Sequence, residues 1–164
     1  MLASEIVRAL KLTAHPEGGH FREIGRSSEV IPHQGFAERY RGDRRLYTVI
    51  YYLLQHGEVS RFHRLQSDEI WCLLVGGPLY LHCIAEDGQH TVLKLGTALE
   101  QGEQPQSIVP RRSWFGACLE SSANFALASC TVIPGFEFAD FELGNRDRLL
   151  ATYPAHREII ELLS

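Results

Sequence analysis

The spacing of apolar residues predicts short helices at both ends of the chain. Residues 3–11 carry apolar side chains at helical intervals, and so do residues 145–152 and 156–163. The HPEGGH segment at 15–20 contains a proline and a pair of glycines, which exclude a helix and predict a turn leading into a strand. The chain is therefore expected to begin and end with short helices that flank a different kind of structure.

Between residues 46 and 132 the pattern changes to short apolar, β-branched and aromatic runs separated by turn residues. The predicted strands are Tyr47–Leu54, Val59–His63, Glu69–Val75, Pro78–Ile84, His90–Leu95, Ser107–Val109, Ser113–Leu119 and Phe125–Val132. The dipeptide Asp87-Gly88 has the composition of a tight hairpin turn. Short strands repeated at this spacing are typical of an all-β sandwich or barrel.

Aromatic residues alternate with polar ones after the last predicted strand. Phe136 and Phe138 alternate and Phe141 follows three residues later, a pattern that suits an extended segment laid over the core. Asp140 and Glu142 lie among them, and a buried carboxylate needs a partner. We therefore expect both carboxylates to form structural salt bridges with arginines.

Composition narrows the class of protein. The net charge of -4 offers no basic stripe for nucleic acid, and no apolar run approaches the roughly twenty residues that span a bilayer. The four cysteines are widely spaced without a CxxC pair, as expected of free thiols in a reducing compartment. We expect a cytoplasmic protein, with residues 1–164 forming a single domain that binds neither nucleic acid nor membrane.

The densest polar cluster in the strand region lies between Gly57 and Gly76. It resembles the first motif of the cupin superfamily, G-x5-H-x-H-x3-E-x6-G, with His63 and Glu69 in place and Leu65 where the second histidine would stand. Strand geometry predicts that His63 and Glu69 face each other across a hairpin inside the barrel. The expected fold is an all-β cupin double-stranded β-helix, or jelly-roll barrel, with short N- and C-terminal helices.

The second cupin motif, P-x-G-x2-H, is less complete. Pro110 is in place, but Arg112 replaces the glycine, so a different turn is expected there, and Phe115 replaces the histidine. One histidine and one glutamate rarely hold a transition metal tightly without other ligands. No cofactor is therefore expected. If a divalent metal does bind, its protein ligands would be His63 and Glu69.

Further segments make the resemblance more specific. They are HPEGGHFRE (15–23), YYLL (51–54), SRFHRLQSDEIW (60–71), PQSIVP (105–110) and VIPGFEFADFEL (132–143). Over nearly its whole length the chain resembles a group of bacterial and fungal single-domain cupins to which no activity is assigned. That resemblance implies a cupin fold and a homodimer.

The motif provides the first candidates for a small-molecule site. His63 and Glu69 suit a catalytic acid/base pair, because histidine titrates near neutral pH and a nearby carboxylate raises its pKa. A hydrogen-bonded pair left from a lost metal site is the alternative. Strand alternation would put Arg61 on the same face as His63, where it could clamp an anion. Trp71 should share the face of Glu69 as an aromatic wall.

Other candidates rest on residue type. Tyr52 is a possible acid, Gln106 a possible hydrogen-bonding group, Trp114 a second wall residue, and Arg22 a second anion clamp. Core packing or surface exposure is the alternative for each. The charged residues beside the glycine turn either reach over the barrel mouth or pair with exposed charges: Glu17, Arg22 and Glu23. For Glu23 the second reading is favoured.

Three functions remain open on the sequence. The first is a metal-independent isomerase or epimerase acting on a sugar or sugar-nucleotide-like ligand with His63 as base, by analogy with sugar-nucleotide epimerases of the cupin fold. The second is a non-catalytic cupin that binds a small ligand or serves for storage. The third is a metal-dependent cupin with a reduced ligand set. The retained His63 and Glu69 favour the first, and the lost ligands favour the second.

Overall fold

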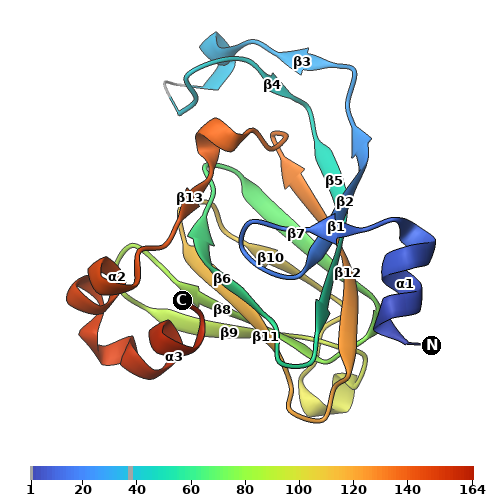
Figure 1. The fold of residues 1–164 in the computed structure, drawn as a ribbon. Coiled ribbons are helices and arrows are strands. Elements are labelled where there is room, and N and C mark those ends of the chain that lie inside the picture. The colour runs from blue at the N-terminus through green and yellow to red at the C-terminus, as the bar shows by residue number, and fades with distance from the viewer. Residues whose placement is uncertain (1, 37–38) are drawn as a thin grey trace.

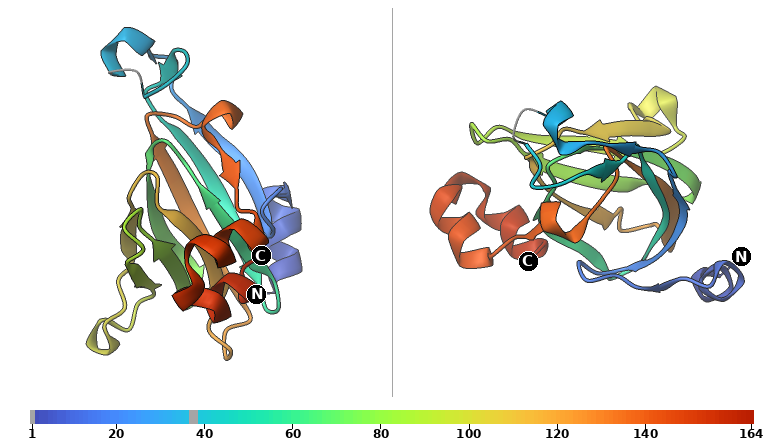
Figure 2. Two further views of the ribbon diagram at one scale, coloured as in Figure 1. Left: turned by 90° about the vertical axis from the view of Figure 1, so that its left-hand side faces the viewer. Right: turned by 90° about the horizontal axis from the view of Figure 1, so that it is seen from above.

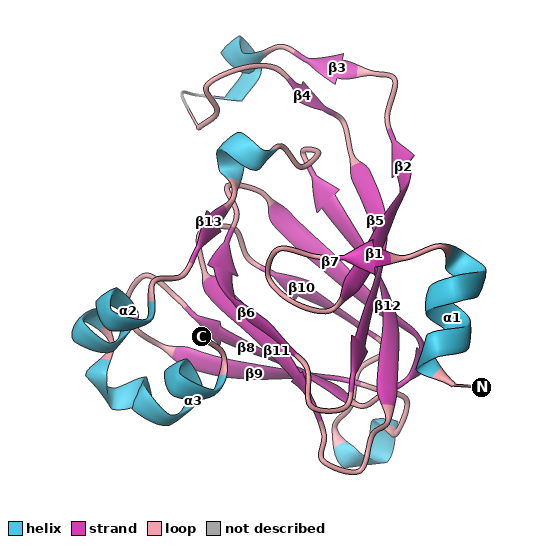
Figure 3. Ribbon diagram, in the orientation of Figure 1, coloured by secondary structure: helices cyan, strands magenta, loops and turns pink. Residues whose placement is uncertain are grey.

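The computed structural model describes residues 2–36 and 39–164, which form two antiparallel sheets curved around a common interior (Figure 1). The first sheet has the strand order β1 (Thr13–Ala14), β2 (His20–Arg26), β5 (Thr48–Gln55), β12 (Phe125–Ile133), β7 (Asp68–Gly76) and β10 (Gln106–Val109). The second has the order β13 (Glu142–Leu143), β6 (Val59–Arg64), β11 (Trp114–Leu119), β8 (Leu79–Ile84) and β9 (His90–Leu95). The expected jelly-roll barrel is confirmed, and each predicted strand corresponds to an observed one (Figure 3).

A short two-stranded arm, β3 (Val30–Ile31) with β4 (Arg44–Arg45), extends beyond one end of the barrel (Figure 1). The predicted hairpin is also present, since β8 and β9 pair in antiparallel register through a tight turn around Asp87-Gly88. Among the described residues, four 3-10 helices occupy connections: η1 (His33–Phe36), η2 (Leu99–Gln101), η3 (Phe138–Asp140) and η4 (Pro154–His156).

The main hydrophobic core fills the space between the two sheets. Its largest fully buried members include Trp71, Tyr52 and Phe115. Leu65 and Phe115, which stand where a metal cupin has histidines, are both buried in this core. Burial of such side chains is the main favourable contribution to folding of a barrel of this kind.

The predicted terminal helices lie outside the barrel, on opposite sides (Figure 2). Helix α1 (Ala3–Leu10) packs Ile6 against Leu53 and Leu127 on the outer face of the first sheet. Helices α2 (Arg146–Thr152) and α3 (Arg157–Leu162) cover the second sheet. In the described part of the chain, no helix has both the length and the apolar content that a bilayer span requires.

A β-bulge in β6 changes which side chains face the interior. Phe115 pairs with His63 and Ala117 pairs with Ser60, so β6 has one residue more than β11 between these two pairs. Ser60 and His63 therefore both point inward, although strict alternation would separate them. Phe62 points outward, where it packs with the buried residues of α2 and α3.

The turn before β11 keeps a glycine-type conformation without a glycine. Arg112 has a φ of +64°, the left-handed region that glycine adopts freely. Its backbone N–H donates to the Leu65 carbonyl at 2.8 Å. The different turn that was expected at this position is therefore not observed.

Candidate functional site

A cavity of about 140 Å³ lies inside the barrel, and its mouth is the rim where the partly exposed Glu23, Arg26, Glu137 and Phe138 line it. Its deep part is lined by His15, Glu17, His63, Glu69 and Trp71, and aromatic side chains form much of the remaining wall. Concave, mostly apolar cavities with a few convergent polar groups are the usual form of small-molecule sites. This cavity is therefore the candidate site.

His63 and Glu69 reach the cavity from different sheets. His63 lies on β6 in the second sheet and Glu69 on β7 in the first, and both are buried. The short connection between β6 and β7 carries the chain across the barrel instead of forming a hairpin. The predicted shared interior is thus correct for both residues, whereas the predicted hairpin is wrong.

Glu17 reaches the same interior from the loop between β1 and β2, with only 4% of its surface exposed. Gly18 and Gly19 have φ values of +114° and +67°, which allow the loop to turn tightly. The Glu17 carbonyl accepts from the Arg61 backbone N–H at 2.9 Å, and the Tyr52 hydroxyl donates to the Gly18 carbonyl at 2.8 Å. These contacts hold the Glu17 carboxyl group inside the barrel.

Glu17 and His63 share one proton. The Nδ1 atom of His63 lies 2.7 Å from the Arg61 carbonyl oxygen, which only accepts, so Nδ1 carries a hydrogen. The Nε2 atom lies 3.1 Å from Oε2 of Glu17. Because each of these two atoms has a lone pair, a proton must lie between them. The other oxygen of Glu17 accepts from Ser60 Oγ at 2.9 Å.

The surroundings favour Glu17 as the holder of that proton. Burial, together with the nearby charge of Glu69, raises the pKa of Glu17 well above its usual value. Burial lowers the pKa of His63 to about 3. Both directions give a neutral carboxylic acid that donates to a neutral imidazole.

Glu69 differs from Glu17 because one of its carboxyl oxygens accepts no hydrogen bond from the described residues. Its Oε2 atom is buried and has no hydrogen-bond partner among the described residues, and the same holds for Nε1 of Trp71. Burial raises the pKa of Glu69 to about 7, although the nearby indole N–H of Trp71, which does not reach hydrogen-bond geometry, lowers it. The cavity therefore contains an unpartnered carboxyl oxygen and an unpartnered indole N–H that a ligand could satisfy.

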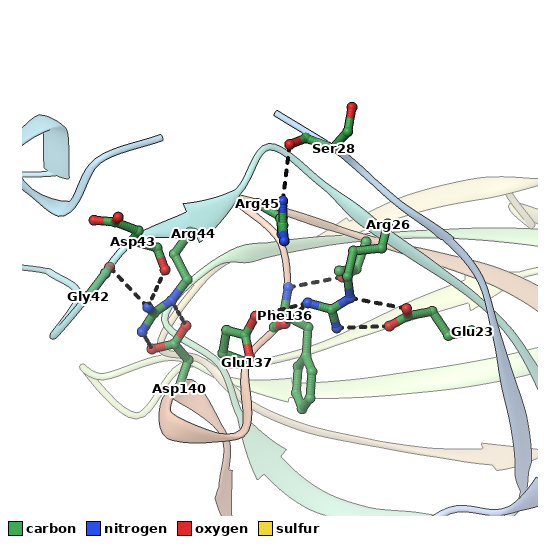
Figure 4. A network of polar contacts seen from close by, with 11 residues as sticks. Glu23, Arg26, Ser28, Gly42, Asp43, Arg44, Arg45, Phe136, Glu137 and Asp140 are labelled. Carbon is green, nitrogen blue, oxygen red and sulfur yellow. Dashed lines mark hydrogen bonds and ion pairs between the residues drawn. The ribbon is translucent and has the colours of Figure 1, made fainter. Parts of the chain in front are cut away.

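Ion pairs fix the cavity mouth (Figure 4). Arg26 donates to Glu23 at 2.8 Å and to Glu137 at 2.9 Å. Arg44 forms a two-fold contact with Asp140, with both N···O distances 2.6 Å. These pairs hold the segment carrying Phe136, Phe138 and Phe141, which all line the cavity.

Predicted ion pairs near the mouth are found. Asp140 bonds Arg44, and Glu142 bonds Arg64 at 2.7 Å, as expected for structural salt bridges. Glu23 pairs with Arg26, the favoured alternative for that residue. The expected extended aromatic segment is broken by η3, although Phe136 and Phe141 do pack on the core.

Four of the predicted site residues line the cavity and four do not. Tyr52 and Trp71 line it with His63 and Glu69. Arg61 does not, because the bulge turns it away from the face of His63. Its guanidinium instead donates to the carbonyls of Pro16 and Glu17, outside the barrel interior.

The other three predicted ligand-binding residues also lie outside the cavity. Arg22 stacks on the ring of Tyr51 at 5.9 Å, away from the interior. Gln106 is exposed on β10. Its side chain points away from the barrel interior, on the opposite face of the strand from its inward-facing neighbours. Trp114 packs with the C-terminal helices and lies under Arg64 at 4.5 Å. The predicted pocket positions of all three are wrong.

The donor set does not fit a cupin metal centre. In residues 2–36 and 39–164, no three His, Cys, Asp or Glu side chains are arranged to hold a metal ion. Leu65 and Phe115 occupy two of the usual ligand positions, and Glu17 engages the Nε2 atom of His63.

Replacing Gly18 by alanine is expected to disrupt the loop that carries Glu17. A Cβ atom at Gly18 would collide with the Val59 carbonyl oxygen, and the φ of +114° is unfavourable for alanine. We expect urea denaturation to show a loss of about 2 kcal/mol or more in unfolding free energy. Gly57→Ala is the matched control, since its φ is +82° but its Cβ would meet nothing within 4 Å. Equal losses in the two variants would contradict the close approach at Gly18.

Comparisons with known proteins agree with this architecture. A family model described as "Cupin superfamily (DUF985)" matches residues 4–144. The chain is 30% identical over 145 residues to the uncharacterized protein YML079W of Saccharomyces cerevisiae, covering 83% of this chain and 72% of that one. It is 39% identical to the crystal structure of protein SO0799 from Shewanella oneidensis, with a TM-score of 0.89 and coverage of 100% and 98% of the two chains. A hypothetical protein from Leishmania major gives 32% identity and a TM-score of 0.92, covering 100% and 99%. The chain therefore belongs to the DUF985 family of the cupin superfamily.

Proposed function

We propose that this protein is a small-molecule enzyme of the isomerase or epimerase kind, which moves protons within the barrel cavity without a metal. One observation carries the proposal: two buried carboxyl groups and an imidazole line a single cavity, and their surroundings favour different protonation states. Pairs of titratable groups whose pKa values are pushed apart are the usual basis for acid and base assignments.

Glu69 is the base in this proposal. Its pKa of about 7 makes it partly ionised at neutral pH, and its Oε2 atom is free of other partners among the described residues. In the open-chain form of a sugar, which ring opening in solution supplies, the carboxylate would take a proton from the carbon beside the carbonyl, and the C–H electron pair would move into that carbonyl to give an enolate. His63, the base expected from the sequence, already accepts a hydrogen bond from Glu17.

Glu17 is the acid. It would give the enolate carbon the proton that it otherwise donates to Nε2 of His63, so that one proton leaves the substrate and one replaces it. Ser60 and His63 would position the carboxyl group, since both contact its oxygens. Exchange with solvent would then restore the proton on Glu17 and remove the one on Glu69, which balances the cycle.

The test is solvent exchange at carbon. Aldoses and ketoses incubated with the protein in D2O should lose C–H signals beside the carbonyl in proton NMR spectra. Glu69→Gln should slow this exchange by about 100-fold or more, whereas Glu142→Gln, an exposed residue on β13, should not. Exchange that proceeds at the full rate in Glu69→Gln would remove Glu69 from the role of base.

A non-catalytic, ligand-binding cupin is the second candidate. The observation that favours it is the burial of Leu65 and Phe115 in the core, where histidines would serve a metal. Ligands that raise the melting temperature of the wild-type protein without any solvent exchange would favour this alternative. Stoichiometric metal in protein purified without a histidine tag would instead favour a metal-dependent cupin.

A further inference from the structure

We infer that the cavity takes an uncharged hydroxylated ring the size of one monosaccharide, bearing no phosphate, carboxylate or nucleotide. The inference deepens the proposed function by naming the class of ligand for the same site. It rests on that proposal only in taking the barrel cavity as the place where the ligand binds.

The charged side chains that line the cavity disfavour an anionic ligand. The described residues that line the cavity include four carboxyl groups, those of Glu17, Glu23, Glu69 and Glu137, but one guanidinium, that of Arg26. Arg26 already donates to Glu23 and to Glu137. An anion entering this cavity would lose its hydration and meet carboxyl groups without a free cation to pair with.

The positions of the other arginines support the same conclusion. A nucleotide or sugar phosphate needs a cationic clamp, for which guanidinium groups are best suited. The guanidinium of Arg61 donates hydrogen bonds to backbone carbonyls outside the barrel interior, and Arg22 lies over Tyr51 on the outer face. Neither lines the cavity.

The volume of the cavity limits the size of the ligand. The cavity measures about 140 Å³, and an apolar cavity of roughly 150 Å³ is known to hold one benzene molecule. One six-membered ring with its hydroxyl groups therefore fills the enclosed part, and any larger substituent would be directed to the mouth. A nucleotide attached to that ring would have to lie outside it.

The polar atoms and the aromatic side chains that line the cavity both suit a hydroxylated ring. A hydroxyl group both donates and accepts, so ring hydroxyls could satisfy the unpartnered Oε2 of Glu69 and Nε1 of Trp71 together. Trp71, Phe136 and Phe141 supply apolar surfaces on which the C–H faces of such a ring can pack. A purely apolar ring would leave both polar atoms unsatisfied.

The test uses matched sets of compounds that differ in charge: D-glucose, D-glucuronate and D-glucose 6-phosphate, and the corresponding galactose set. Isothermal titration should show binding of at least one free sugar, and its uronate and phosphate should bind about tenfold more weakly or worse. Glu69→Gln should weaken binding of the free sugar. Arg22→Gln, outside the barrel, should leave all affinities unchanged.

Tighter or equal binding of the anionic members would overturn the inference, and so would the failure of every free sugar to bind. The proposed function fails separately. Neutral sugars that bind without C–H exchange in D2O would remove the proton-transfer proposal but keep the ligand class. Exchange seen with an anionic sugar alone would keep the proton-transfer proposal but remove the uncharged ligand class.

Discussion

Arg44→Met is expected to lower the free energy of unfolding by about 3–5 kcal/mol, because it leaves the Asp140 carboxylate buried without its partner. The side chains of Arg44 and Asp140 are only 5% and 6% exposed, and two N···O contacts of 2.6 Å join them. Removing either partner forces a charge to stay buried or the segment to open. Urea denaturation monitored by tryptophan fluorescence measures the loss.

A second ion pair of the same residue types provides the control. Arg64 and Glu142 are 33% and 53% exposed, so Arg64→Met should cost no more than about 1 kcal/mol. The double variant Arg44→Met/Asp140→Leu should recover most of the loss, since no charge is left buried. Similar losses of unfolding free energy in Arg44→Met and Arg64→Met would show that the buried pair stabilises the protein no more than the exposed one.

Glu69→Gln is expected to make the protein more stable than wild type at neutral and alkaline pH. Burial raises the pKa of Glu69 from 4.5 to about 7 in the folded protein. Below pH 4.5 the carboxyl group is protonated in both the folded and unfolded states. Between pH 4.5 and 7 only the unfolded state ionises, so wild type loses about 3 kcal/mol over this range that the glutamine variant keeps.

The difference between the two proteins is the quantity to measure, across pH 4 to 8 in urea. Burial lowers the pKa values of His15 and His82 to about 4 and that of His63 to about 3, so all three make both proteins less stable as the pH falls from 6.5 toward 4. Subtracting one curve from the other cancels this effect. A difference that does not change with pH would mean that Glu69 titrates normally and is not buried as described.

The barrel could be predicted from the sequence because its signals are local. Alternating apolar residues and turn dipeptides gave all the strands from β5 to β12, and helical spacing gave α1, α2 and α3. The very short strands β1, β3, β4 and β13 were not predicted, because two residues are too few to show a period.

The site was only partly predictable, because it depends on how distant segments meet. The spacing of His63 and Glu69 placed them in one interior, but the same spacing fits both a hairpin and a connection between sheets. Arg61 was placed on the wrong face because nothing in the local sequence reveals the extra residue in β6. The bulge becomes visible only when β6 pairs with β11.

Glu17 is the residue whose importance the sequence understated. The sequence places it either over the barrel mouth or in an exposed ion pair, whereas in the structure it contacts His63 inside the barrel. The available signal was the glutamate between a proline and two glycines. The positive φ angles of Gly18 and Gly19 are what turn that loop, and its destination is a tertiary feature.

The proposed acid/base site depends above all on the protonation state of His63. Nitrogen-15 NMR of histidine-labelled protein, assigned with His63→Gln, reports which ring nitrogen carries hydrogen. We expect a neutral ring from pH 5 to 8, with hydrogen on Nδ1 and an Nε2 that accepts a hydrogen bond from Glu17. An imidazolium in this range, an ordinary titration near pH 6.5, or hydrogen on Nε2 alone would contradict it.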